Sequence, residues 1–151
     1  MGYINQRNIM NNYETLFVIK PTLTDEETTA QIAKVTAILE REGAEILAID
    51  NMGMRKLAYP VQKNKRGLYT IIYFKAAGTI INELERNLKF NEEVIKYLTV
   101  RYSNTKEVAQ FKKLVTAATK IEEATKAEET AKAEEAPEAE APTTTTETVE
   151  A

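Results

Sequence analysis

The chain has 151 residues and a formal net charge of −3, from 20 Lys and Arg against 23 Asp and Glu. It contains no Cys and no His, which excludes disulfide scaffolds, thiol nucleophiles and the commonest metal ligands, so we expect no metal site and no cofactor. No stretch approaches the roughly 18 apolar residues of a membrane span, and residues 1–9 lack the apolar core of a signal peptide. We therefore expect a cytoplasmic protein.

The charges are segregated along the chain. Residues 1–120 carry 18 basic and 13 acidic side chains, a net charge of +5. Residues 121–151 carry 2 Lys and 10 Glu, a net charge of −8. The pattern indicates a mildly basic domain followed by an acidic tail, so each part has its own expected partners.

The first elements are a strand and a helix. Residues 13–20 are rich in aromatic and β-branched types, which predicts a strand. A helix is expected to start at Thr24, because Glu27 three residues later completes a capping box. Gly43 supplies its C-terminal stop.

The remaining pattern completes a β-α-β-β-α-β order. It consists of an extended segment over 44–61 with a bulge near Asn51–Gly53, a polar connection at 62–67, a strand at 68–75, a helix opening at Gly78–Thr79 and a strand at 94–102. This order predicts a ferredoxin-like α+β fold: a four-stranded antiparallel sheet with two helices on one face. The other face would have no helix of its own, so water or a partner would cover it.

The expected organisation has four parts. Residues 1–11 form an N-terminal extension, 12–103 the ferredoxin-like domain, 104–120 a possible short helix and 121–151 a disordered acidic tail. In the third part Val108, Phe111, Val115 and Ala118 have helical spacing, so this helix could pack on the domain or on a neighbour. A chain ending after Ser103 is expected to lose almost no core residue and to keep its fold, with a thermal midpoint that moves by a few degrees at most.

A long stretch without acidic residues is the clearest functional signal. The 32 residues between Asp50 and Glu83 hold no Asp or Glu and six basic side chains. These are Arg55, Lys56, Lys63, Lys65, Arg66 and Lys75, interleaved with Tyr59, Tyr69 and Tyr73. Cations neutralise phosphates and rings stack on unpaired bases, so the stretch favours RNA binding. The alternative is a solvated hairpin whose lysines only maintain solubility.

The predicted third strand matches the RNA recognition motif only weakly. That module needs a basic residue and glycine followed by aromatic rings at fixed positions. Arg66, Gly67 and Tyr73 fit the pattern, but Leu68 and Thr70 stand where stacking rings are required. Base stacking on the sheet face is therefore poorly supported.

A second motif is more specific. Gly53–Pro60, with the sequence GMRKLAYP, resembles the signature of the bacterial small-subunit ribosomal protein six family. Further matching blocks follow the family order over residues 12–102: Tyr13-Glu14, Gly67-x-Tyr69, Glu85–Phe90 and Val94–Lys96. The resemblance implies a ferredoxin-like, non-catalytic component of the small ribosomal subunit. It also implies binding to the central domain of the small-subunit ribosomal RNA together with small-subunit protein eighteen.

The candidate RNA- or partner-binding residues combine the acid-free stretch with the family motif. They are Tyr13, Arg55, Lys56, Tyr59, Lys63, Lys65, Arg66, Arg86 and Arg101. Consecutive strand residues point to opposite faces, so Arg55 and Lys56 are expected to reach different partners, whereas Leu57 is expected in the core. Lys89 and Lys96 stand where the family often has Arg, which keeps the charge but loses the bidentate fork.

The predicted fold is also compatible with two other functions. One is a ferredoxin-like regulatory or ligand-binding module that does not bind RNA, but no feature of the sequence indicates which ligand it would bind. The other is an acylphosphatase-like hydrolase, which needs a glycine-rich anion loop, and the loop Lys20–Leu23 contains no glycine. We expect no membrane partner and no small-molecule substrate.

Overall fold

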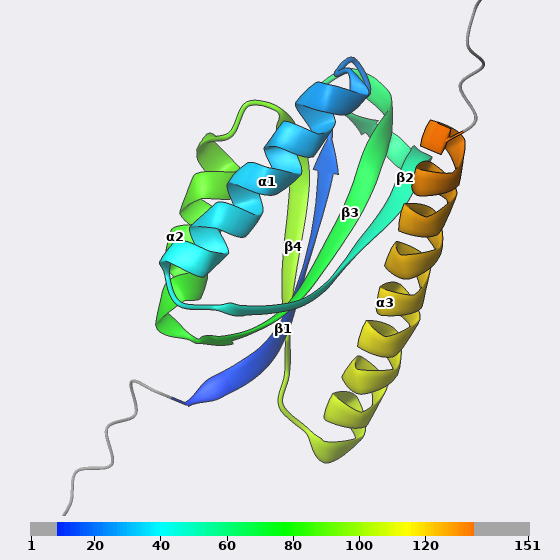
Figure 1. Cartoon of the computed structure of the whole chain (residues 1–151). Helices are drawn as coiled ribbons and strands as arrows, with labels where there is room; N and C mark the ends of the chain where they lie inside the picture. Colours follow the sequence, from blue (N-terminus) through cyan, green and yellow to red (C-terminus); the bar gives the residue numbers. More distant parts are fainter. Residues whose placement is uncertain (1–8, 135–151) are drawn as a thin grey trace, which may run out of the picture.

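The computed structural model of the chain describes residues 9–134. The elements are β1 (Met10–Ile19), α1 (Asp25–Arg41), β2 (Glu45–Val61), β3 (Asn64–Ala77), α2 (Thr79–Phe90), β4 (Val94–Tyr102) and α3 (Thr105–Glu134). The strands form one antiparallel sheet in the order β2-β3-β1-β4, and α1 and α2 lie together on one of its faces (Figure 1). This confirms the predicted ferredoxin-like arrangement. β1 begins inside the predicted extension 1–11, because Met10 already pairs with Ala77.

Two local sequence signals are confirmed. The side chain of Thr24 accepts a hydrogen bond from the Glu27 N–H at 3.3 Å, and the Glu27 carboxylate accepts one from the Thr24 N–H at 2.8 Å. Helix α1 then ends before Gly43, whose φ of +85° is a left-handed conformation that favours glycine. The bulge in β2 lies between Asn51 and Gly53, where the register shifts and the Asn51 side-chain oxygen accepts the Gly53 N–H.

The hairpin between β2 and β3 differs from the prediction. The polar segment 62–67 was expected to be a connection, but only Gln62 and Lys63 form the turn, and β3 begins at Asn64. Both turn residues have positive φ, 48° and 66°. A two-residue turn of this kind matches the right-handed twist of its flanking strands. Val61 pairs with Asn64 beside the turn, after an irregularity in the register between Lys56 and Val61. The basic hairpin is consequently a long two-stranded arm.

The main core lies between the sheet and the two helices α1 and α2. Phe17, Ile72 and Phe74 from the sheet are fully buried there, together with Leu39 of α1 and Leu84 of α2. These side chains alternate along their strands and recur at helical spacing in the helices, as an amphipathic pattern requires.

A second core lies on the opposite face of the sheet, under α3. Phe111 is 2% exposed and its ring centroid lies 5.8 Å from that of Tyr73 and 5.1 Å from that of Tyr102. Ala118 of α3 and Ala48 of β2 belong to the same buried cluster. The expectation of a face without any helix is therefore wrong for this part of the sheet, as is the expectation that little core lies beyond Ser103.

Helix α3 is also longer than predicted. The sequence pattern placed its end at residue 120 and began a disordered tail at 121, whereas the helix continues to Glu134. The Glu-, Ala- and Lys-rich repeat consists of strong helix formers, and a helix already fixed by packing propagates more easily than one that must nucleate. The rest of the predicted tail, 135–151, and residues 1–8 of the predicted extension lie outside the described residues.

Candidate nucleic-acid interface

The β2–β3 arm carries the basic candidates on exposed positions. Arg55 and Lys56 of β2 are both exposed, and so are Lys65 and Arg66 of β3 and Lys63 in the turn. In the part of the chain that the structure describes, none of these five side chains takes part in a salt bridge. The arm therefore presents several solvated cations without neutralising carboxylates.

Two of these cations face each other across the hairpin. Lys56 and Arg66 are register partners, and Arg55 pairs with Gly67. Like charges directly opposite on neighbouring strands destabilise the pairing. An anionic ligand that lies across both side chains would remove this repulsion, so the arrangement suits a phosphate backbone.

Tyr59 ties the arm to the far edge of the sheet. The Lys96 ammonium donates a hydrogen bond to the Tyr59 hydroxyl at 2.8 Å and lies 4.9 Å from the centre of its ring. This hydrogen bond raises the pKa of Lys96, so its charge is retained at neutral pH. β2 and β4 are the two edge strands of the sheet, so the end of the arm bends across the sheet face to make this contact.

A small hydrophobic cluster supports that bend. Leu57 is 7% exposed and packs with Val18 and Ile95, as expected for a core residue, and Val61 and Tyr69 border the cluster. Tyr59 itself remains 59% exposed, so its ring is accessible to a partner.

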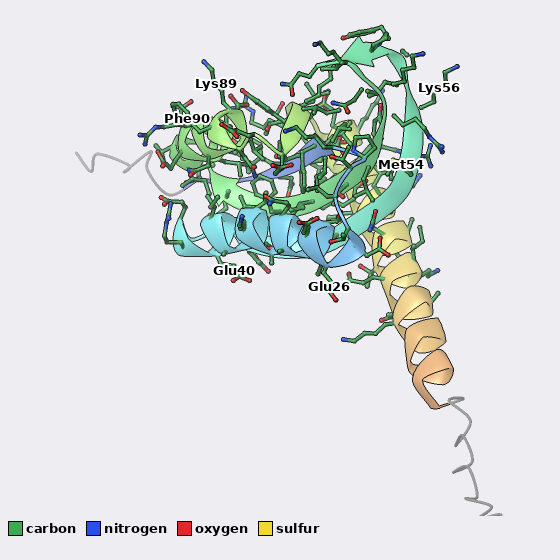
Figure 2. All side chains as sticks on the ribbon, turned by 90° about the horizontal axis from the view of Figure 1, so that it is seen from above. Glu26, Glu40, Met54, Lys56, Lys89 and Phe90 are labelled. Carbon is green, nitrogen blue, oxygen red and sulfur yellow. The ribbon has the colours of Figure 1, made fainter. Side chains whose placement is uncertain are left out.

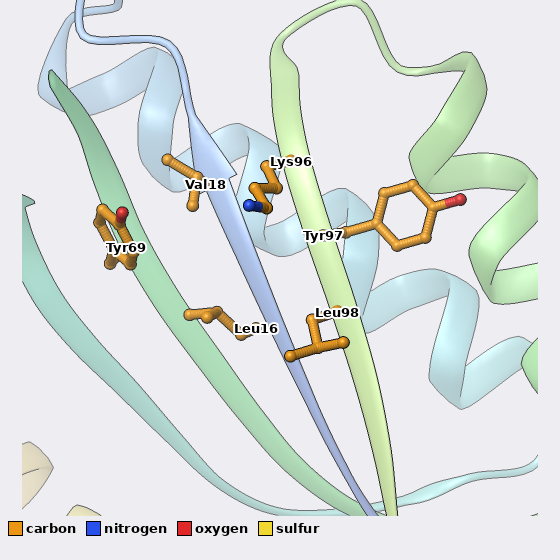
Figure 3. Close-up of a pocket in the computed structure, with 6 residues that line it drawn as sticks. All are labelled: Leu16, Val18, Tyr69, Lys96, Tyr97 and Leu98. Carbon is orange, nitrogen blue, oxygen red and sulfur yellow. The ribbon is translucent and has the colours of Figure 1, made fainter. Parts of the chain in front are cut away.

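Beside the arm, the sheet face forms an open apolar groove. It has a volume of about 200 Å³ and is lined by Leu16, Val18, Tyr69, Lys96, Tyr97 and Leu98. Figure 3 shows Tyr97 projecting away from the other five side chains, toward α2. Leu98 is 56% exposed although it pairs with Leu16 across the β1–β4 ladder. An exposed apolar surface of this kind suits a protein partner.

The structure buries Tyr13 in the main core. Its side chain is 5% exposed and stacks on Phe74 at a centroid distance of 5.7 Å in the main core. A ring held between core residues offers no face to a base. Tyr13 is therefore not among the exposed candidates.

Arg86 and Arg101 lie apart from the basic arm. Arg86, on α2, forms an ion pair with Glu83 at 3.4 Å and covers the Phe90 ring. Figure 2 shows the end of α2, marked by Lys89 and Phe90, on the opposite side of the molecule from Lys56. Arg101 is exposed near the end of β4. The structure thus groups five of the basic candidates with Tyr59 and separates these two.

Sequence reasoning missed the groove. A signal for it was present in β1, where Leu16 and Val18 are apolar although they alternate with the core residues Phe17 and Ile19 and so point to the opposite face of the sheet. Such a pattern shows that both faces of a strand are apolar. It does not show which part of the face opposite α1 and α2 is left uncovered by α3.

Among residues 9–134 no group of three or more Asp or Glu side chains is placed to hold a metal ion. No helix in this range combines the length and apolar character needed to cross a membrane.

Comparison with known proteins identifies the family. The sequence model of the Ribosomal protein S6 family matches residues 12–101. The chain belongs to that family. "Small ribosomal subunit protein bS6" of Sulfurovum sp. is 65% identical over 114 residues, covering 76% of this chain and 90% of that protein. The same protein of Nitratiruptor sp. is 46% identical over 112 residues, covering 74% and 88%.

A solved structure agrees with this assignment. The crystal structure of 30S ribosomal protein S6 from Thermotoga maritima superposes with a TM-score of 0.62 at 32% identity, covering 70% of this chain and 98% of that one. Membership of the Ribosomal protein S6 family makes the chain a component of the small ribosomal subunit, a part of the cytoplasmic ribosome, and not an enzyme. The family match ends before α3, which begins at Thr105.

Proposed function

We propose that this chain binds the central domain of the small-subunit ribosomal RNA through its basic β2–β3 arm, jointly with small-subunit ribosomal protein eighteen. The observation that carries the RNA contact is the cross-strand pair Lys56 and Arg66 in an exposed arm. Their mutual repulsion is relieved when phosphates lie between or across them. Arg55, Lys63 and Lys65 extend the same basic surface.

Tyr59 supports the same assignment. Its exposed ring lies on the arm beside the Lys96 ammonium, so an aromatic face and a cation are presented together. Such a pair can stack on an unpaired base and neutralise the neighbouring phosphate.

The apolar groove is the proposed docking site for protein eighteen. It directly adjoins the arm, because Lys96 both lines the groove and bonds to Tyr59. A protein seated on Leu16 and Leu98 would therefore also touch the RNA-binding arm. This contiguity explains why the two partners would bind jointly.

A ligand-binding module without RNA is less well supported. Small-molecule sites usually enclose about 300–1,000 Å³ and bury most of the ligand. The groove holds about 200 Å³ and its Leu98 wall is largely exposed. Its shape suits the surface of a protein better than an enclosed ligand.

The test is a titration of a central-domain RNA fragment at several salt concentrations. A net charge of +5 over residues 1–120 allows only a handful of phosphate contacts, so the chain alone should bind weakly, with a shallow salt slope of about 0.7–0.9 per contact. The preformed complex with protein eighteen should bind more tightly and with a steeper slope. Equal affinity of the chain alone and of the complex would overturn joint binding, and absence of RNA binding by both would overturn the function.

A further inference from the structure

Helix α3 carries a second basic surface, beyond residues 12–101 that the family model matches. Between residues 105 and 120 its basic side chains are Lys106, Lys112, Lys113 and Lys120. All four are exposed. The helical spacing of Phe111 and Ala118 predicted only a packing role for this segment, and these lysines belong neither to the arm nor to the groove.

The orientation of this half of the helix is fixed by its buried side. Phe111 and Ala118 are 2% and 1% exposed and lie seven residues apart, so they occupy the same helical face. Phe111 is held between the rings of Tyr73 and Tyr102. Because two full turns are anchored on the sheet, the lysines on the other side point in fixed directions from the domain.

The lysines form one stripe. Lys106, Lys113 and Lys120 recur every seven residues, which places them on one face at intervals of about 10 Å along the axis. Lys113 and Lys120 line a single shallow depression with Lys112, Thr116 and Ala117. Lys112 also borders the adjoining hollow between α3 and the sheet, together with Lys75 of β3. The basic surface thus extends from the helix to the sheet.

Among the described residues, no ion pair neutralises the stripe. The acidic residue nearest the start of α3 is Glu107, whose carboxylate accepts the N–H groups of Ser103 and Asn104 at 3.0 Å each. It therefore caps the helix, and the next acidic side chain in the sequence is Glu122. Among the side chains described for residues 9–134, no salt bridge involves Lys106, Lys113 or Lys120.

We propose that the lysine stripe of α3, Lys106, Lys113 and Lys120, is a second RNA-binding surface that contacts the phosphate backbone of the ribosomal RNA. The proposal rests on the proposed RNA-binding function and extends it to a separate surface. An evenly spaced row of flexible ammonium groups on a rigid helix neutralises successive phosphates but has no planar fork for base edges. The contact would therefore add affinity and salt dependence without sequence preference.

The test compares charge-matched variants in the complex with protein eighteen. The double variant Lys113→Gln/Lys120→Gln removes two charges from the stripe, and Gln keeps the helix propensity. The control Lys34→Gln/Arg41→Gln removes two charges from the exposed side of α1, on the other face of the sheet. Circular dichroism and thermal unfolding establish that both variants fold.

The stripe variant should lower RNA affinity about 10-fold at low salt and reduce the salt slope by about 1.5, whereas the control should match the wild type. If the salt slope of the stripe variant equals that of the control, while Arg55→Ala/Lys56→Ala still weakens RNA binding, the proposal for the stripe is overturned and the proposed function stays intact. Loss of pairing with protein eighteen at an unchanged RNA slope would make the stripe a protein contact and also overturn the proposal. Failure of the wild-type complex to bind RNA would instead count against the proposed function and remove the basis of the stripe.

Discussion

At the scale of single residues, Gly67 shows how closely the arm approaches the sheet. A Cβ atom at this position would lie 2.3 Å from Cγ1 of Val18 and 3.3 Å from the Ile19 carbonyl oxygen. Val18 is buried, so neither atom can move away freely. The glycine in the family block Gly67-x-Tyr69 therefore has a packing reason.

We expect Gly67→Ala to lower the free energy of unfolding by about 1–3 kcal/mol, as overpacking does. Chemical denaturation followed by circular dichroism measures the change. Gly78→Ala is the control, because its Cβ would meet only the Tyr13 hydroxyl at an ordinary 3.4 Å. Loss of backbone freedom in the unfolded chain should make that variant neutral or slightly more stable. Equal effects of the two substitutions would contradict the packing argument.

The pair Arg55 and Lys56 should act in assembly and not in stability. Both side chains are exposed, and removal of Lys56 relieves its repulsion with Arg66, so Arg55→Ala/Lys56→Ala should change stability by less than about 1 kcal/mol. The salt slope of RNA binding should fall by about 0.7–0.9 for each phosphate that the variant no longer neutralises. Pairing with protein eighteen, measured without RNA, separates an RNA role from a protein role. If the double variant folds, pairs with protein eighteen and enters small subunits like the wild type, Arg55 and Lys56 are solvated strand residues with no role in assembly.

At the scale of elements, α3 is part of the folded domain. A chain that ends after Ser103 loses Phe111 and exposes Tyr73 and Ala48. Loss of a buried Phe costs about 3–5 kcal/mol, so the thermal midpoint should fall by roughly 10 °C or more, well beyond the few degrees expected from the sequence. The main core under α1 and α2 stays intact, so the shortened chain should still fold. A midpoint within a few degrees of the full chain would show that α3 contributes little.

The start of α3 should respond to pH through Glu107. Hydrogen bonds from the N–H groups of Asn104 and Ser103 lower its pKa below the ordinary value of 4.5. The folded state therefore gains stability above pH 4.5 and loses it as the pH falls through the lowered pKa. Glu107→Gln should reduce the thermal midpoint at pH 7, and the difference from the wild type should shrink on acidification. A difference that does not depend on pH would show that the charge of the cap is irrelevant.

Local signals in the sequence predicted most of the fold, because they act through neighbouring residues. The capping box at Thr24 and the bulge at Gly53 involve contacts within three residues, and both were correct. The length of the β2–β3 arm was missed because Gln62 and Lys63 adopt positive φ without a glycine to indicate it. The spacing of Phe111 and Ala118 predicted a buried helical face but could not show that its partner is the chain's own sheet.

The candidate site was predictable in its charges and not in its shape. The absence of acidic residues from Asn51 to Asn82 is visible in the sequence and locates the basic arm. The contact between Tyr59 and Lys96 depends on a bend that carries one edge strand toward the other, and no short-range pattern encodes it.

At the scale of the whole molecule, the bent β2–β3 arm and α3 cover different parts of the sheet face opposite α1 and α2. On β3, Tyr69 borders the groove, whereas Ile71 and Tyr73 belong to the cluster under α3. The groove therefore lies between the bent arm and the C-terminal helix. A partner seated there would contact Lys96, whose ammonium bonds to Tyr59 of the arm, and α3 limits how far the partner can extend along the sheet.

This division predicts that Leu98 is needed for pairing with protein eighteen. Leu98 is 56% exposed, so Leu98→Asp should leave the free energy of unfolding within about 1 kcal/mol of the wild type. Burial of the new carboxylate against an apolar partner is costly, so affinity for protein eighteen, measured by calorimetry without RNA, should fall at least about 10-fold. Phe90→Asp is the control, because Phe90 is 72% exposed on α2, on the other face of the sheet, and should leave pairing unchanged. Normal pairing of the Leu98 variant, or an equal loss in both variants, would show that the groove is not where the partner docks.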